Sequence, residues 1–177
     1  GVIAFGLGGY EVGFPPEQFV KAFDRARAAG LPSVPHAGET EGPSSIWGSI
    51  KLLGAVRIGH GVRCLEDPEL VAYLRENKIP LEVCPSSNVR LGVVPSLEAH
   101  PLPNLLEAGL TVTVNSDDPP MFSTTLTREW TSCAKAFGWN RDTVASLSIN
   151  SVEHSLASPE RKATLEQLVR DYLESDA

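Results

Sequence analysis

Up to residue 115, short apolar runs alternate with segments of helical periodicity, and this alternation constrains the fold most strongly. Apolar runs at 2–7, 33–36, 56–60, 79–84 and 110–115 are typical of strands. Strands that alternate with helices favour a parallel sheet with right-handed crossover connections. The sequence therefore predicts an α/β fold with five strands, although periodicity does not distinguish an open sheet from part of a barrel.

Turn and capping residues mark where the helices begin and end. Pro15-Pro16 open the helix after the first apolar run, and Gly30 ends it. Asp67-Pro68 is a pairing typical of a helix N-terminus, because the Asp side chain caps the first turn and Pro needs no N–H partner there. Helices are expected at 15–30, 45–53, 67–74, 102–109, 124–137, 141–156 and 159–173.

Length and charge exclude several classes of protein. A chain of 177 residues suffices for one domain of typical size and not for two. Its 15 basic and 22 acidic side chains give a net charge of −7, which argues against binding to nucleic acid or to a membrane surface. No apolar run approaches the roughly 20 residues of a membrane span. Cys64, Cys84 and Cys133 lack a metal-binding spacing and are expected to be buried, reduced thiols of a cytoplasmic protein.

Histidine and acidic residues stand at the ends of three of the predicted strands. His36 ends the second strand and is followed by Glu39, His60 ends the third, and Asp117-Asp118 follow the fifth. Each alone has an ordinary explanation, as a core histidine, a loop carboxylate or a turn. In parallel α/β proteins, however, the carboxyl ends of the strands meet at one edge, where reactive groups collect. Histidine with carboxylate is typical of a hydrolytic zinc site.

The segments around these residues resemble the signature blocks of the adenosine/adenine deaminase family. The blocks are His36–Glu39, Arg57–Gly61, Leu81–Asn88 and Val114–Pro119, in the family's order, with Gly6–Glu11 as a looser match. The resemblance covers nearly the whole chain. It implies a metal-dependent (β/α)8 TIM-type barrel hydrolase that replaces the 6-amino group of a purine with oxygen.

The resemblance also implies roles at the metal centre. His36 and Asp117 would be ligands of a Zn²⁺ ion. Glu39 would protonate the purine ring nitrogen next to the reacting carbon. His60 would orient and deprotonate the zinc-bound water, whose pKa zinc brings toward about 7.

The same resemblance implies two contacts with a small-molecule purine nucleoside or base. Gly9 would approach a ring nitrogen through its backbone, which suits a residue without a side chain. Asp118 would accept a hydrogen bond from the attacking hydroxide or from the purine's imidazole edge. We expect adenosine as the substrate. Adenine and aminofutalosine, an adenosine-like nucleoside with a modified sugar, stay open as alternatives.

The sequence departs from the family's pattern at one point. The family supplies two further zinc ligands from a His-x-His pair at the end of its first strand, and no His-x-His occurs among these residues. We therefore expect residues 1–177 to be the C-terminal portion of a single barrel domain, about five strand–helix units followed by C-terminal helices. Such a piece would bind zinc weakly and show negligible activity. It would self-associate or bind an N-terminal fragment across the barrel edges at 2–5 and 110–115, or it would fold poorly.

A different class of function also stays open. The chain could be a non-catalytic, deaminase-derived domain that binds a purine or a partner without hydrolysing it. The absence of the two upstream histidines favours this reading. The presence of His36, Glu39, His60, Asp117 and Asp118 opposes it, because a degenerate site is expected to lose some of them.

Overall fold

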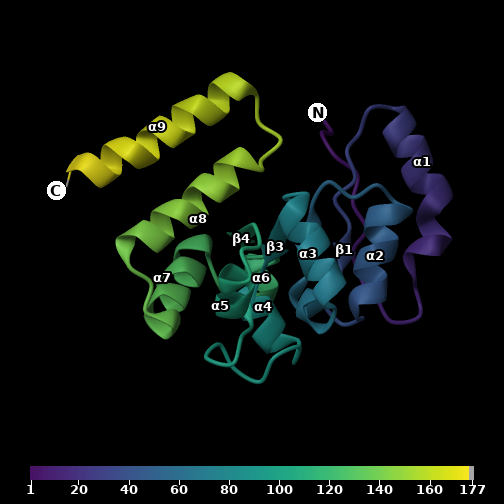
Figure 1. The fold of residues 1–177 in the computed structure, drawn as a ribbon, viewed down its shortest axis with the longest axis horizontal. Helices are drawn as coiled ribbons and strands as arrows, with labels where there is room; N and C mark the ends of the chain where they lie inside the picture. Colours follow the sequence, from purple (N-terminus) through teal and green to yellow (C-terminus); the bar gives the residue numbers. More distant parts are fainter. Residues whose placement is uncertain (176–177) are drawn as a thin grey trace.

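A parallel sheet of four short strands forms the centre of the computed structural model, which describes residues 1–175. The strands follow the order of the chain, and each pairs with the next, so every connection passes through helical segments (Figure 1). The strands are β1 (His36–Ala37), β2 (Ile58–His60), β3 (Leu81–Val83) and β4 (Val112–Val114).

Helices of various lengths connect and follow the strands. In Figure 1, α1 and α2 lie toward one end of the molecule and α8 and α9 toward the other, with the strands between. The helical segments are η1 (Pro16–Phe19), α1 (Val20–Ala28), α2 (Pro43–Lys51), η2 (Val62–Glu66), α3 (Pro68–Glu76), α4 (Pro85–Arg90), α5 (Leu102–Glu107), α6 (Pro119–Phe122), α7 (Leu126–Phe137), α8 (Arg141–Glu153) and α9 (Pro159–Ser175).

The predicted helices are confirmed to within a few residues. Side chains cap the helix after Asp67, the predicted position, and the helix after Asn140. The Asp67 carboxylate accepts hydrogen bonds from the backbone N–H groups of Glu69 and Leu70, and the Asn140 side chain accepts one from Thr143. The short segments η2, α4 and α6 were not predicted, because four to six residues are too few to show an apolar period.

The prediction of a buried first strand at 2–7 is wrong. Val2 and Ile3 are 78% and 65% exposed, and only Phe5 forms a bridge, to Ser33. The Phe5 carbonyl accepts a hydrogen bond from the Val34 N–H group, so this segment still runs beside residues 33–36. The His36 N–H group likewise donates to the Leu7 carbonyl, but the pairing amounts to the single bridge at Phe5, so residues 2–7 do not form a strand of the sheet.

The hydrophobic core lies between the sheet and the helices that cover it. Its fully buried side chains come from every strand and from α2, α3, α5, α7 and α8. All three cysteines are buried and unpaired, as predicted. Representative core residues are Ile46, Ile58, Leu70, Leu74, Leu81, Leu102, Leu105, Val112, Cys133 and Leu147.

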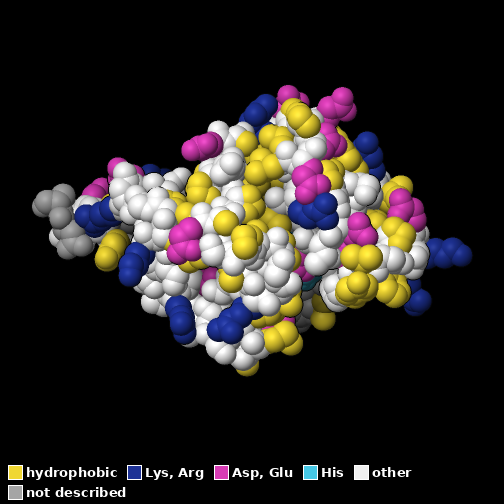
Figure 2. All heavy atoms as spheres, turned by 90° about the horizontal axis from the view of Figure 1, so that it is seen from below, with side chains coloured by type: hydrophobic (Ala, Val, Ile, Leu, Met, Phe, Trp, Pro, Cys, Tyr) yellow, Lys and Arg dark blue, Asp and Glu magenta, His cyan; other side chains and the backbone are white. Residues whose placement is uncertain are grey.

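Several large apolar side chains lie on the surface. Figure 2 shows hydrophobic side chains gathered in the middle of one face, with acidic and basic side chains around them. Helix α9 contributes no buried residue, and its Leu168 and Tyr172 are 58% and 66% exposed. Within residues 1–175, no helix combines the length and the apolar character needed to cross a bilayer.

Gly38 occupies a position after β1 where only glycine fits. Its φ is +69°, and an added Cβ would lie 2.3 Å from Cδ1 of Ile46, a side chain with no exposed surface. We expect Gly38→Ala to lower the free energy of unfolding by about 1–3 kcal/mol more than a matched control, because the core must be overpacked. The control is Gly92→Ala, with a similar φ of +73° and no atom within 4 Å. Equal losses for the two variants in urea titrations would contradict this packing.

Candidate active site

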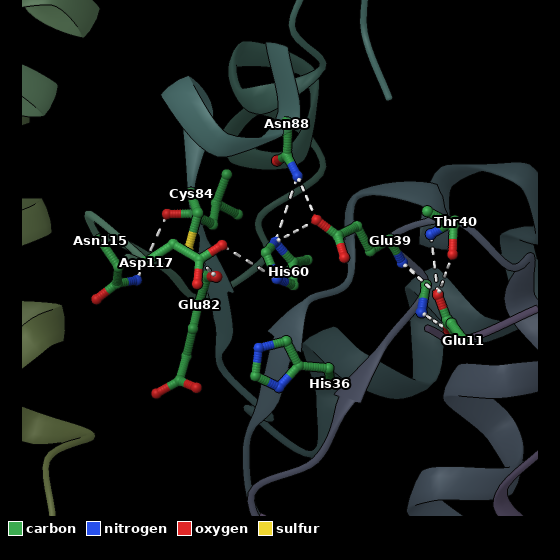
Figure 3. Close-up of polar contacts among 12 residues, drawn as sticks. Glu11, His36, Glu39, Thr40, His60, Glu82, Cys84, Asn88, Asn115 and Asp117 are labelled. Atoms are coloured by element: carbon green, nitrogen blue, oxygen red, sulfur yellow. Dashed lines mark hydrogen bonds and ion pairs between the residues drawn. The ribbon is translucent and has the colours of Figure 1, made fainter. Parts of the chain in front are cut away.

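His36, His60 and Asp117 meet at the carboxyl ends of the strands. His36 begins β1, His60 ends β2, and Asp117 lies three residues beyond β4. One potential ligand atom from each lies within 4.8 Å of the other two. Glu39 Oε1 lies 3.5 Å from Nδ1 of His60, while the His60 Nε2 atom lies 3.9 Å from Oδ2 of Asp117. Figure 3 shows His60 between the two carboxylates, with His36 beside it.

Two of these residues have an unusual backbone conformation. His60 has a φ of 61° and Asp117 a φ of 54°, in the left-handed region that residues other than glycine seldom adopt. Such conformations cost roughly 1–3 kcal/mol each and cluster at functional sites, where the surrounding structure holds them. The strain indicates that these two strand ends are shaped to place side chains.

His36 is oriented as a metal ligand would be. Its Nδ1 atom lies 2.8 Å from the Leu7 carbonyl oxygen, which can only accept a hydrogen bond, so Nδ1 carries the proton and Nε2 keeps its lone pair. An added Cβ on Gly59 would lie 3.1 Å from Cγ of His36, so the glycine lets the ring pack against β2. An imidazole nitrogen beside the Asp117 carboxylate is a donor set that fits zinc.

Burial changes the proton affinities of Glu39 and His60 in opposite directions. The Glu39 side chain is 12% exposed, and burial raises its pKa, with a further rise from the nearby charge of Asp117. Burial lowers the pKa of His60, and the neighbouring His36 lowers it further. Glu39 is therefore more readily protonated near neutral pH than an ordinary glutamate, which suits a general acid, and His60 is neutral.

Glu11 holds the loop that carries Glu39, a role that sequence reasoning missed. Its carboxylate accepts hydrogen bonds from four successive backbone N–H groups and from the hydroxyls of Thr40 and Ser45 (Figure 3 shows part of this set). The only signal in the sequence was the loose family match at Gly6–Glu11. The donating N–H groups and their distances are Gly38 (2.6 Å), Glu39 (3.2 Å), Thr40 (2.9 Å) and Glu41 (2.9 Å).

We expect Glu11→Gln to lower the free energy of unfolding by about 2–3 kcal/mol at pH 7, since hydrogen bonds to a charged acceptor are lost. Burial raises the pKa of Glu11, but the hydrogen bonds from Glu41, Ser45, Thr40 and Gly38 outweigh it and lower the pKa below 4.5. The ionised form thus stabilises the fold above pH 4.5, and this contribution disappears as the pH falls through the lowered pKa.

The measurement is urea unfolding at pH 7 and at pH 3.5, with the exposed Glu17→Gln as the control. The difference in the free energy of unfolding between the parent and Glu11→Gln should be smaller at the lower pH. If Glu11→Gln lost no more stability than Glu17→Gln at both pH values, Glu11 would not hold this loop.

The two predicted substrate contacts lie outside the cluster. Gly9 lines a cavity of about 300 Å³ that also has His36 and Phe14 in its wall. Its φ is +108° and nothing lies within 4 Å of an added Cβ, so the backbone conformation, not crowding, requires glycine there. Asp118 is exposed at the start of α6 and its side chain does not cap that helix.

The sequence matches the family model described as "Adenosine deaminase" over residues 1–172. The chain is 48% identical over 172 residues to a protein named aminodeoxyfutalosine deaminase from Streptomyces avermitilis, which covers 97% of this chain and 48% of that protein. It is 43% identical over 169 residues to an adenosine deaminase of Klebsiella pneumoniae, covering 96% of this chain and 51% of that protein. The chain therefore spans about half the length of these relatives.

Two solved structures show the same arrangement of strands and helices. The crystal structure of an adenine deaminase from Arthrobacter aurescens superposes with a TM-score of 0.96 at 40% identity, covering 98% of this chain and 53% of that chain. An amidohydrolase from Burkholderia ambifaria with bound Zn superposes with a TM-score of 0.87 at 26% identity, covering 98% and 51%.

Proposed function

Because this chain belongs to the adenosine deaminase family, we propose that the whole protein hydrolyses the 6-amino group of a purine with the help of a zinc ion. The observation that carries the proposal is the meeting of His36, His60 and Asp117 within 4.8 Å, with Glu39 against His60. These are the residue types that a hydrolytic metal site with an acid–base group requires.

His36 and Asp117 are the proposed zinc ligands. His36 presents Nε2 because its Nδ1 proton is engaged by the Leu7 carbonyl, and Asp117 presents a carboxylate. Zinc would lower the pKa of a coordinated water to about 7 and so supply a nucleophile at neutral pH. Catalytic zinc sites normally use three protein ligands. We propose that the remaining ligands are supplied by residues outside this sequence.

Glu39 is the proposed proton donor to the purine ring. Its pKa is raised, and its Oε1 atom accepts a hydrogen bond from the Asn88 amide at 3.4 Å, which restrains the carboxyl group. Protonation of the ring nitrogen lets the neighbouring carbon accept an electron pair from the attacking hydroxide. A C–O bond then forms and the C–N bond breaks. The amino group leaves as ammonia with the proton of the added hydroxyl, which leaves a 6-oxo group on the ring.

The cavity beside His36 is the proposed binding site for the purine. Leu7, Phe14 and Phe19 give it an apolar wall, which suits a flat aromatic base. Gly9 would meet the base through its backbone. For the exposed Asp118, the proposed contact with the imidazole edge requires the ligand to reach the start of α6.

Three candidate substrates share the 6-aminopurine ring and differ in what is attached to it. Adenosine is the substrate expected from the signature blocks. Relatives named aminodeoxyfutalosine deaminase, at 48% and 47% identity, rank above those named adenosine or adenine deaminase, at 43% and 42%. This order supports a nucleoside with a modified sugar as the second candidate.

The test is steady-state kinetics with the zinc-loaded protein from the complete reading frame on adenosine, adenine and aminodeoxyfutalosine. We expect one of the three to give a kcat/KM at least tenfold above the others, with stoichiometric ammonia release. Tight binding of a purine without ammonia release would instead support a non-catalytic purine-binding domain.

A further inference from the structure

His100, a buried histidine far from the metal cluster in sequence, has a fixed pattern of hydrogen bonds. It is 3% exposed, and its Nδ1 atom lies 3.0 Å from the backbone nitrogen of Leu102. A backbone N–H group can only donate, so Nδ1 is the acceptor. Burial lowers the pKa of His100 to about 4, so the ring is neutral at pH 7 and its single proton is on Nε2.

The Nε2 proton of His100 determines the orientation of the Asn88 amide. Nε2 lies 3.1 Å from Oδ1 of Asn88, which accepts the hydrogen bond. Asn88 has no exposed surface, so water does not compete. The amide nitrogen then faces the opposite way, 3.3 Å from Nδ1 of His60 and 3.4 Å from Oε1 of Glu39. A reversed amide would place a donor against His100 and an acceptor against Glu39.

The Asn88 amide in turn determines the tautomer of His60. Because Nδ2 of Asn88 donates, Nδ1 of His60 must accept and therefore carries no proton, so the proton of the ring lies on Nε2. His60 is 1% exposed, so no solvent contact offers another arrangement.

We propose that Asn88 and His100 are positioning residues that hold His60 with its proton on Nε2, so that His60 presents a hydrogen-bond donor to the site between His36 and Asp117. We call the hydrogen bonds that run from His100 through Asn88 to His60 the relay. The relay is a property of the fold, and its consequence for catalysis rests on the proposed function. In this tautomer His60 would hold an oxygen of the reacting species by donation and would not take up the proton of a water. That proton would pass to the Asp117 carboxylate, which lies 3.9 Å from His60 Nε2.

The direct test is long-range ¹H–¹⁵N NMR of the imidazole rings, in the protein from the complete reading frame labelled with ¹⁵N-histidine. Loss of one ring's signals in His60→Gln assigns His60. The parent should show the Nε2–H tautomer at His60 and at His100. A His60 ring with its proton on Nδ1 would overturn the proposal without any variant.

Two substitutions change the relay in defined ways. Asn88→Asp replaces the donor by a second acceptor, so His60 should change to the Nδ1–H tautomer. His100→Leu removes the donor that orients the amide, and should lower kcat about tenfold or more with KM and zinc content nearly unchanged. His100→Gln can donate to Oδ1 of Asn88 through its own amide and should restore most of kcat.

The outcomes separate the relay from the proposed function. If the parent shows the expected tautomer but no purine is deaminated, the proposed function fails and the relay stands. If purines are deaminated but Asn88→Asp, folded by circular dichroism, keeps the parent tautomer at His60, the relay is wrong. Equal kcat losses in His100→Leu and His100→Gln would also contradict it.

Discussion

Replacing Glu39 by Gln should abolish most turnover while leaving the metal in place. Loss of one acid–base group typically costs roughly 10²–10⁴-fold in rate, and we expect a larger loss if ring protonation is obligatory for attack. The metal should stay because Glu39 does not belong to the group of potential ligands formed by His36, His60 and Asp117. Its carboxylate instead accepts a hydrogen bond from the Asn88 amide and lies 3.5 Å from Nδ1 of His60. The measurement is kcat together with zinc content by mass spectrometry.

Glu41→Gln is the matched control for this variant. Glu41 lies two residues further along the same loop, and its backbone N–H group is also held by Glu11. Its turnover should remain near that of the parent. A nearly normal kcat in Glu39→Gln would exclude Glu39 as the proton donor. A loss of zinc in that variant would instead identify it as a ligand.

Replacing His36 or Asp117 should remove zinc. Both place a potential ligand atom in the same group of atoms. Loss of a residue that only hydrogen-bonds to a metal ligand typically weakens metal binding 10–100-fold. Loss of a ligand itself should therefore weaken zinc binding by at least that factor. His36→Ala and Asp117→Asn are the variants to measure. Asn tolerates the left-handed backbone that Asp117 adopts, so the change is confined to the ligand.

His154→Ala is the control for zinc content, because His154 lies at the end of α8, outside the metal cluster. It should keep the zinc of the parent. Normal zinc content in both His36→Ala and Asp117→Asn would contradict the ligand assignment. Retained zinc in one of them only would contradict that residue's role.

The parts of the fold and site that the sequence predicted follow from strand periodicity. Parallel strands end at one edge, so His36, His60 and Asp117 had to approach each other once their strands were recognised. The comparisons confirm membership of the family and a partial α/β barrel, both of which the signature blocks indicated. The prediction of a first strand failed because Val2 and Ile3 are apolar, as strand residues often are, and yet lie exposed on the surface. Apolar residues alone do not distinguish such a segment from a strand.

The contacts that support the site could not be predicted, because they join loops far apart in the sequence and no hydrophobic periodicity links such loops. Glu11 lies 27 residues before Gly38, whose N–H group it binds, and Asn88 lies 28 residues after His60. Nothing in the sequence distinguishes a glutamate after a glycine-rich turn, or a histidine in a loop, from an ordinary surface residue. Their roles emerge only when tertiary packing removes water and brings these polar atoms within hydrogen-bond distance of one another.

The most direct test of the central claim is ammonia release from a 6-aminopurine by the zinc-loaded protein from the complete reading frame, measured in water enriched in ¹⁸O. The account predicts one ammonia per 6-oxo product, with ¹⁸O at the purine carbon that carried the amine, and a rate of release at least about 10²-fold lower in Glu39→Gln. Binding of adenosine, adenine or aminodeoxyfutalosine by the zinc-loaded protein, with the amino group left intact in all three, would contradict it.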